Sequence, residues 1–148
     1  MSTDFSRFID AQETTYATAL AELRAGRKRT HWIWFVFPQI AGLGSSWTSS
    51  QYAIAGASMA RAYLRHPVLG ARYLEAVAVV HSQVCNGNIP IERLMGSHID
   101  ALKLVSSLTL FGAVAEETRL VTLADAILEV AARQGFVRCA HTELAVRD

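Results

Sequence analysis

Hydrophobic residues recur at intervals of three and four positions along most of this chain, a period that is typical of helices with one buried face. The pattern predicts helices over residues 3–25, 58–65, 67–85, 90–95, 97–115 and 118–134, with a further helical stretch around Tyr52 and Ile54. Residues 31–37 fit a buried strand equally well by period, and their helical surroundings favour a helix. No alternating apolar and polar pattern, which would indicate half-buried strands, recurs along the sequence. The expected fold class is therefore all-α, with about six to eight helices of ordinary length.

Two segments lack this helical period. Residues 39–50 are rich in glycine and serine, which predicts a loop. Residues 136–148 form a tail that adds a short helix or frays. At 148 residues, the chain is expected to form a single domain with its core in residues 1–135.

The segment 97–115 differs from the other predicted helices because it is apolar around nearly its whole circumference. Such a helix is usually buried. Lys103, Ser106 and Thr109 would then be polar groups near the interior, where each needs a partner or a ligand.

The composition narrows the function classes. About half of the residues are hydrophobic, 18% are charged and the net charge is +1, which describes an ordinary globular protein. The low net charge makes non-specific nucleic-acid binding unlikely, because that affinity comes from a cationic surface. With neither a signal-peptide pattern nor an apolar run that could span a membrane, we expect a cytoplasmic protein.

Motifs for metals and common cofactors are missing. Cys85 and Cys139 lack metal-ligand spacing and are expected to be free thiols. The pair Gly42 and Gly44 lacks the third glycine of a dinucleotide-binding fingerprint. The sequence therefore predicts no metal site and no cofactor.

An aromatic block holds two of the three tryptophans and two of the six phenylalanines within residues 32–37. The simpler interpretation is that these rings belong to the core. However, four rings in six positions cannot share one helix face, so some should point to a groove or a second packing surface. We therefore include Trp34, Phe37 and Gln39 as candidate ligand-binding residues, with Gly42 and Gly44 at the rim, where glycine permits close backbone approach.

A basic cluster precedes the aromatic block. It is either a solvated connection between helices or an anion site beside aromatic rings. Lys28, Arg29 and His31 are its candidate ligand-binding residues.

Lys103 and Ser106 lie one helical turn apart, so the lysine could activate the serine or bind an anion. These two are the candidate catalytic residues, and Ser107 and Thr109 are added as ligand-binding candidates. The alternative is that Lys103 pairs with Asp100 and that the hydroxyl groups bond to helix carbonyls.

Four stretches together carry a resemblance to a known family. They are His31–Gln39, Gly42–Gly44, Tyr63–Gly70 and Asp100–Phe111, with the pattern HWxWFxFPQ, GLG and KxxSSxTLF running through three of them. The chain resembles a bacterial family of small all-helical proteins of unknown function, sometimes labelled calpastatin-like. The resemblance implies an all-α single domain and supplies no activity.

Three functions follow as hypotheses. The first is a binding domain whose pocket takes a small anionic, nucleotide-like ligand. The second is a hydrolase that acts on a nucleotide or ADP-ribose glycosidic bond in the same pocket. The third is an interaction module that docks a protein partner with exposed aromatic rings. The first two require the surroundings of Trp34 and Lys103 to meet across one hollow. The sequence does not predict an oligomeric state.

Overall fold

The computed structural model describes residues 4–44 and 46–147, and within these ranges the protein is helical. The expected all-α fold is confirmed. The described residues form nine α-helices and one short π-helix: α1 (Ser6–Arg24), α2 (Ile33–Val36), α3 (Trp47–Gln51), α4 (Ala57–Arg65), α5 (Pro67–His81), η1 (Ser82–Asn86), α6 (Ile91–Met95), α7 (His98–Val114), α8 (Thr118–Arg133) and α9 (Ala140–Val146). Four of the α-helices, α2, α3, α6 and α9, have seven residues or fewer.

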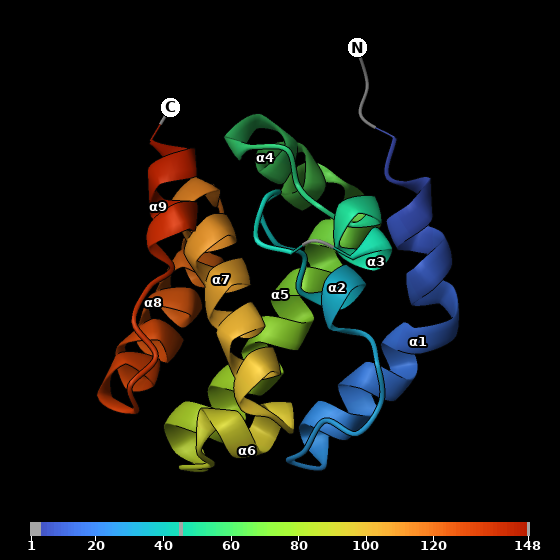
Figure 1. The fold of residues 1–148 in the computed structure, drawn as a ribbon. Helices are drawn as coiled ribbons and strands as arrows, with labels where there is room; N and C mark the ends of the chain where they lie inside the picture. Colours follow the sequence, from blue (N-terminus) through green and yellow to red (C-terminus); the bar gives the residue numbers. More distant parts are fainter. Residues whose placement is uncertain (1–3, 45, 148) are drawn as a thin grey trace.

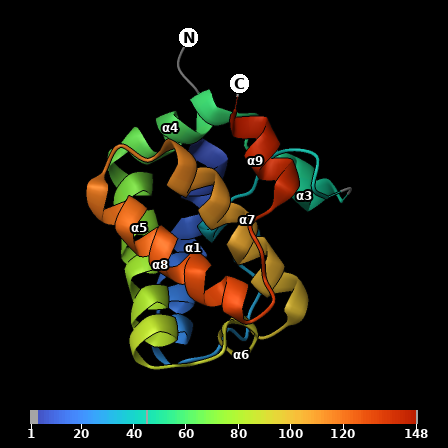
Figure 2. The same ribbon diagram turned by 90° about the vertical axis from the view of Figure 1, so that its left-hand side faces the viewer.

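Helix α7 is the central element of the fold. It packs against α8, α4 and α6, and against α9 on the side remote from α1. Helix α5 packs against both α1 and α8, so it connects the α1 side of the molecule to the α7–α8 side (Figures 1 and 2). The start of α1 and the end of α9 lie at the same end of the molecule (Figure 1).

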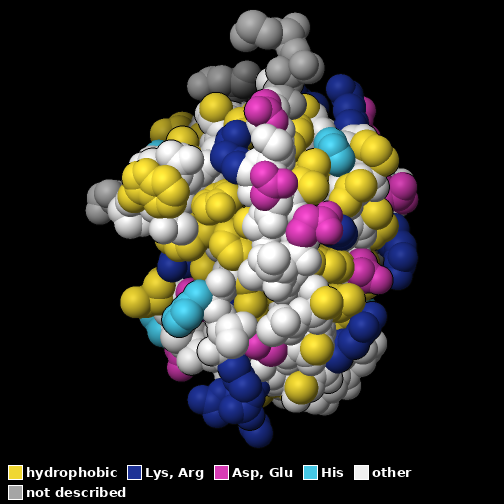
Figure 3. Space-filling model, turned by 90° about the vertical axis from the view of Figure 1, so that its right-hand side faces the viewer, with side chains coloured by type: hydrophobic (Ala, Val, Ile, Leu, Met, Phe, Trp, Pro, Cys, Tyr) yellow, Lys and Arg dark blue, Asp and Glu magenta, His cyan; other side chains and the backbone are white. Residues whose placement is uncertain are grey.

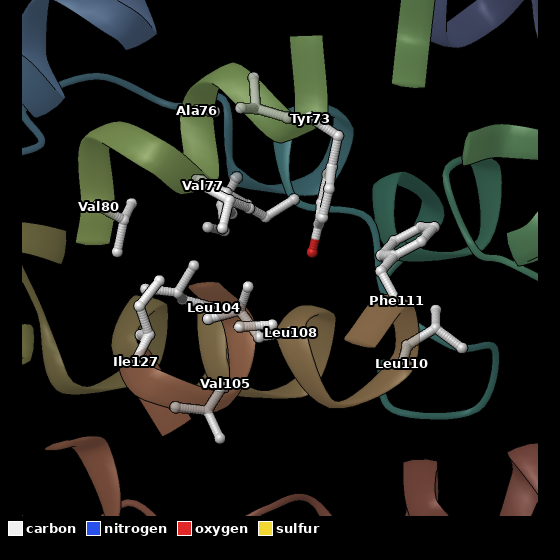
Figure 4. Close-up of a cluster of buried hydrophobic side chains, with 14 of the residues drawn as sticks. Tyr73, Ala76, Val77, Val80, Leu104, Val105, Leu108, Leu110, Phe111 and Ile127 are labelled. Carbon is white, nitrogen blue, oxygen red and sulfur yellow. The ribbon is translucent and has the colours of Figure 1, made fainter. Parts of the chain in front are cut away.

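The hydrophobic core extends through most of the helices, and one part of it lies between α5, α7 and α8. Figure 4 shows Leu104 and Leu108 of α7 directed toward Val77 of α5, while Val105 points to the opposite side of α7. Leu104, Leu108 and Val77 are fully buried. Because α7 has apolar residues around its circumference, it can pack against α5 on one side and against other parts of the chain on the other.

The segment 39–54 differs from expectation at both ends. Helix α3 begins inside the predicted loop because the Ser46 hydroxyl caps it, accepting from the backbone N–H of Ser49 at 3.1 Å. Ile54, expected to be helical, instead forms an isolated bridge with Ile40. Its N–H donates to the Gln39 carbonyl at 2.9 Å, and its carbonyl accepts from Ala41 N–H at 2.8 Å. These two bonds hold the backbone at residues 39–41.

The C-terminal residues are not a loose tail. Phe136 is 5% exposed and its ring lies 5.0 Å from the His98 ring at the start of α7. Helix α9 packs against α7, and Thr142 within it is fully buried. The segment between Phe136 and α9 is therefore held along α7 at both ends.

None of the helices in residues 4–44 and 46–147 is both long and apolar enough to span a bilayer.

Candidate ligand-binding site

The pocket of interest lies on the side of α7 that faces away from α5. It has a volume of about 490 Å³. Its walls come from α2, the segment after α2, the first half of α7 and the segment that leads into α9. The lining residues are Trp34, Gln39, Leu43, Ile99, Leu102, Lys103, Val105, Ser106, Val137, Arg138, Cys139 and Ala140.

Trp34 and Lys103 meet at this pocket, as the sequence hypothesis required. The Lys103 ammonium nitrogen lies 4.3 Å from the centre of the Trp34 ring, a distance at which a cation is attracted to the ring face. It also lies 3.6 Å from Asp100 Oδ1, one turn earlier on α7. The side chain is 23% exposed and is therefore partly accessible to solvent.

Asp100 is shared between two lysines. Its Oδ2 lies 2.8 Å from the Lys28 ammonium nitrogen, which also donates to the Thr30 carbonyl at 2.6 Å. The Lys28 side chain is only 5% exposed. Two ammonium groups around one carboxylate leave one net positive charge, and Lys103 is the lysine that is farther from Asp100 and more open to solvent.

Gln39 supplies a second polar group to the pocket wall. The residue is 3% exposed, and its Nε2 has no hydrogen-bond partner among the described residues. A buried amide without a partner costs free energy, so the great majority of such groups are paired with protein, water or ligand. The Ile40–Ile54 bridge next to Gln39 holds its backbone in place.

Ser106 and Cys139 lie in the same wall, and the sequence analysis did not include Cys139 among the site residues. Burial raises the pKa of the Cys139 thiol, but the donors around the sulfur outweigh burial and hold this pKa below its ordinary value. Polar groups of Thr142, Ser106 and His141 near the sulfur have this effect, although the Thr142 hydroxyl has no hydrogen-bond partner among the described residues. A single cysteine carries no spacing signal, so only the packing of α9 on α7 reveals its position.

Eight of the ten predicted ligand-binding residues do not line the pocket, and three of these eight have uncharged side chains that are buried in the interior. Phe37 is fully buried, with its ring 5.9 Å from that of Tyr73. Ser107 shares a hydrogen bond of 3.0 Å with the Tyr73 hydroxyl. The Thr109 hydroxyl donates to the Val105 carbonyl at 2.7 Å. All three side chains are buried, and internal contacts account for each of them.

The basic cluster is organised by an acidic residue of α1. Glu22 Oε1 accepts from the backbone N–H groups of Arg29 and Thr30 at 2.8 and 3.0 Å and from Trp32 Nε1 at 2.9 Å. Its Oε2 accepts from the Thr30 hydroxyl at 2.7 Å. Partial burial raises the pKa of Glu22, but these hydrogen bonds outweigh it and lower the pKa to about 2.

The predicted anion site at Lys28, Arg29 and His31 is therefore not assembled as one site. Lys28 is buried against Asp100, whereas Arg29 and His31 are exposed and do not line the pocket. Figure 3 shows Lys and Arg side chains gathered at the lower end of the α1 face, where α1 ends in Figure 1. The cluster mainly forms a solvated connection, which was the alternative interpretation.

The two rim glycines also have structural explanations. Gly42 has a φ of 95°, in the left-handed region that favours glycine. A Cβ atom at Gly44 would lie 2.7 Å from the Ser49 side chain and 3.3 Å from the Trp34 ring. Neither glycine lines the pocket, so the close approach expected for a ligand is instead an approach of neighbouring side chains.

The chemistry of the pocket is dominated by hydrogen-bond donors. Lys103, Gln39, Ser106 and Arg138 can all donate, and no carboxylate is among the described residues that line it. The contacts of Lys103 are with Asp100 and the Trp34 ring, both of which attract a cation. No group of three or more His, Cys, Asp and Glu side chains that could hold a metal occurs in the part of the chain that the structure describes.

Residues 2–132 match a family described as "Protein of unknown function (DUF1810)". The chain belongs to this family. It is also similar to a solved structure, the conserved hypothetical protein Rv1873 from Mycobacterium tuberculosis, with 38% sequence identity and a TM-score of 0.78. That likeness covers 97% of this chain and 96% of the other. No curated protein matches the chain.

Proposed function

We propose that this member of the family binds a small organic anion in the pocket that Trp34 and Lys103 line. The ligand resembles a nucleotide because it combines a negatively charged oxygen group with a less polar part. The observation that carries the proposal is the Lys103 ammonium group, which lines the pocket, lies 4.3 Å from the centre of the Trp34 ring and shares the Asp100 carboxylate with Lys28. A ligand oxyanion can pair with this ammonium group through a charge-assisted hydrogen bond.

The local charge supports an anion rather than a cation. Lys28 and Lys103 share one carboxylate, and Arg138 lies 3.3 Å from Asp125 Oδ1 and is therefore paired. The Lys103 ammonium group is the uncompensated charge in this set. Trp34 and Asp100 hold it in place, so binding an anion would cost little further ordering of its side chain.

The rest of the pocket supports a ligand with an apolar portion. Leu43, Val105 and Ala140 line the wall, and the pocket volume falls within the range of small-molecule sites. Because the Lys103 ammonium group covers a face of the Trp34 ring, we expect Trp34 to position the lysine rather than to stack on a base.

The other two hypotheses receive less support. Glycosidic hydrolysis commonly uses a pair of carboxyl groups, and the described lining of this pocket includes none. An interaction module would need the aromatic block to be exposed, but Trp32 is 1% exposed, Phe37 is fully buried, and Trp34 is partly buried.

The proposal can be tested by calorimetric titration of the purified protein with adenosine monophosphate, ribose 5-phosphate and neutral adenosine. We expect at least one phosphate-bearing compound to bind and adenosine to bind more weakly. Lys103→Met should weaken binding of the phosphate compound roughly ten- to a hundredfold, because a hydrogen bond to a charged group contributes about 1.5–3 kcal/mol.

Arg29→Met is the matched control, since it removes the same charge from an exposed side chain outside the pocket. Its affinity should stay within about twofold of the original, because charges exposed to solvent are screened. Equal loss of affinity in both variants would indicate a general charge effect and contradict the proposal, as would adenosine binding as tightly as its phosphate.

A further inference from the structure

We propose that the outward side of α5 joins two copies of this chain into a symmetric dimer. Two observations carry this proposal: the apolar character of that side of the helix, and the charges of two hollows that lie along it. The proposal is independent of the proposed function, because these hollows and the pocket that Lys103 lines have no lining residue in common.

Helix α5 is apolar on both of its sides, although only one side is buried. The residues that face the core are Leu69, Tyr73, Ala76, Val77 and Val80. At 3.6 residues per turn, the opposite side of the helix carries Val68, Ala71, Leu74, Ala78 and Val79. Val68 and Ala71 are exposed, and the other three are partly exposed. A helix that is apolar all round is usually enclosed, so the outward side of α5 lacks a covering partner within the described chain.

The neighbouring helix α8 shows the pattern that is expected of a side facing water (Figure 2). Its exposed residues include Thr122, Asp125 and Glu129, which are three and four positions apart. The contrast between the two helices indicates that the outward side of α5 is suited to a contact rather than to solvent.

Two adjoining hollows lie along this side of α5. One has a volume of about 700 Å³ and extends to Arg24 of α1 and Arg119 of α8. The other has a volume of about 400 Å³ and extends to Glu116 and Glu117 at the start of α8. Both are lined by Ala71 and Leu74, so the two hollows meet at these residues.

The larger hollow is cationic. Among the described residues, the arginine ion pairs are those of Arg65, Arg72 and Arg138, so Arg24 and Arg119 have none. The larger hollow also contains Glu75, which accepts from the Tyr16 hydroxyl at 2.5 Å. Two arginines and one carboxylate leave one net positive charge among its lining residues.

The smaller hollow is acidic. The Arg65 guanidinium holds both oxygens of Glu116, at 2.8 and 2.9 Å. Glu117 lines the same hollow and has no ion pair within the part of the chain that the structure describes. One net negative charge therefore remains beside the net positive charge of the larger hollow.

These opposite charges favour a second copy of this chain as the occupant. A two-fold axis perpendicular to α5, passing near Ala71 and Leu74, sets the two α5 helices antiparallel. It also sets the cationic hollow of each copy against the acidic hollow of the other, which is electrostatically complementary. A partner with a single sign of charge would match one hollow and be repelled by the other.

The side chains near this axis suit a close contact between helices. Ala71 and Ala78 are small, so two α5 helices can approach closely, with Leu74 supplying apolar area. The apolar strip from Val68 to Val79 is only about 17 Å long at 1.5 Å per residue. We therefore expect a dimer that dissociates on dilution rather than a permanent one.

The test is analytical ultracentrifugation of the full-length protein at concentrations from about 1 µM to about 1 mM, which covers dissociation constants over the same range. We expect the average mass to rise from one chain toward two. Raising the NaCl concentration should weaken the association, because the two hollows attract each other through their charges. A mass of one chain at every concentration would overturn the proposal and leave this side of α5 to a different partner.

Substitutions at Ala71 test the position of the contact. Ala71→Glu and Ala71→Arg each place two like charges at the axis, so both should raise the dissociation constant by more than about tenfold. Ala17→Glu is the matched control, because Ala17 is an exposed alanine of α1 that lines neither hollow. Its dissociation constant should stay within about twofold of the original. Ala78→Glu serves as a second variant if circular dichroism shows that an Ala71 variant does not fold.

Mixing the two Ala71 variants tests the symmetry. An equimolar mixture of Ala71→Glu and Ala71→Arg should associate more tightly than either variant alone, by at least about tenfold, because opposite charges then meet at the axis. Native mass spectrometry should show the mixed dimer as the main species. A dimer that survives both substitutions would place the contact elsewhere, and a mixture no tighter than its components would contradict the two-fold arrangement.

Discussion

The two sides of α7 use similar residues in different ways. On the side toward α5, the Ser107 hydroxyl and the Tyr73 hydroxyl share a hydrogen bond inside a buried aromatic cluster, where the Tyr73 and Phe111 rings are 4.6 Å apart. On the pocket side, Lys103 and Ser106 lie near a buried amide that has no partner among the described residues. Polar groups that are satisfied by the protein stabilise the fold, whereas the polar groups on the pocket side are the ones that we propose to bind a ligand.

The largest expected effect on stability comes from comparing one leucine substitution on each side of α7. Leu104 and Leu102 are two positions apart on α7 and therefore point in nearly opposite directions. Leu104 is fully buried and Leu102 is 45% exposed at the pocket. Leu104→Ala should lower the free energy of unfolding by about 2–5 kcal/mol through loss of burial and cavity formation.

Leu102→Ala should change the same quantity by less than about 1 kcal/mol. Urea denaturation monitored by circular dichroism gives both values. Comparable losses of stability in the two variants would mean that the pocket side of α7 is packed as tightly as the core side, which contradicts the comparison of the two sides.

A smaller effect is expected from the adjacent serines. Ser107→Ala leaves the buried Tyr73 hydroxyl without its partner and should cost about 1–3 kcal/mol of unfolding free energy. Ser106→Ala should cost less than about 1 kcal/mol, because water in the pocket can replace the hydroxyl. Thermal denaturation of the two variants and of Ser107→Ala combined with Tyr73→Phe provides the measurement.

The double variant should recover part of the loss, since both partners of the bond are then removed. If the double variant is less stable than Ser107→Ala alone, loss of the hydrogen bond to Tyr73 does not explain the destabilisation by Ser107→Ala.

The smallest effect concerns Glu22, another polar group that is fully used by the fold. The pKa of Glu22 is lowered from 4.5 to about 2 in the folded protein, so its ionised form stabilises the fold above pH 4.5. This stabilisation is lost as the pH falls from 4.5 through about 2. Because the group is only partly buried, we expect roughly 1 kcal/mol at pH 7 after allowance for solvent screening.

Glu22→Gln should therefore be less stable than the original protein at pH 7, and the difference should shrink below pH 4.5. Urea unfolding at pH 7 and pH 3 checks both statements. A difference that is the same at both values of pH would show that the charge of Glu22 does not stabilise the segment 29–32.

The residues that the sequence placed correctly are those with a strong local signal. The three- and four-residue period identified α1, α5, α7 and α8, the longest helices of the fold. The spacing of Asp100 and Lys103 on one helix led to the expectation that they pair, and this ion pair is present. The Lys103 ammonium group also contacts the Trp34 ring. Phe37, Ser107 and Thr109 were assigned to the pocket because residue type alone does not distinguish a buried, satisfied group from one that faces a ligand.

Periodicity also could not place the short elements. Helix α3 depends on a serine cap within a glycine- and serine-rich segment, and its five residues are too few to show a helical period. Ile54 departs from helical geometry because its backbone pairs with residues 39 and 41, which are distant in sequence.

The order of apolar and polar residues by itself determined an all-helical protein with an almost wholly apolar α7, because helical periodicity is a local property that each segment carries. Only the tertiary structure decided which side of α7 became core and which became a pocket. That choice depends on where α5 and α9 pack, and it brings Trp34, Lys103 and Cys139 together from three separate parts of the chain. Such proximity arises from long-range packing, so no local pattern could record it.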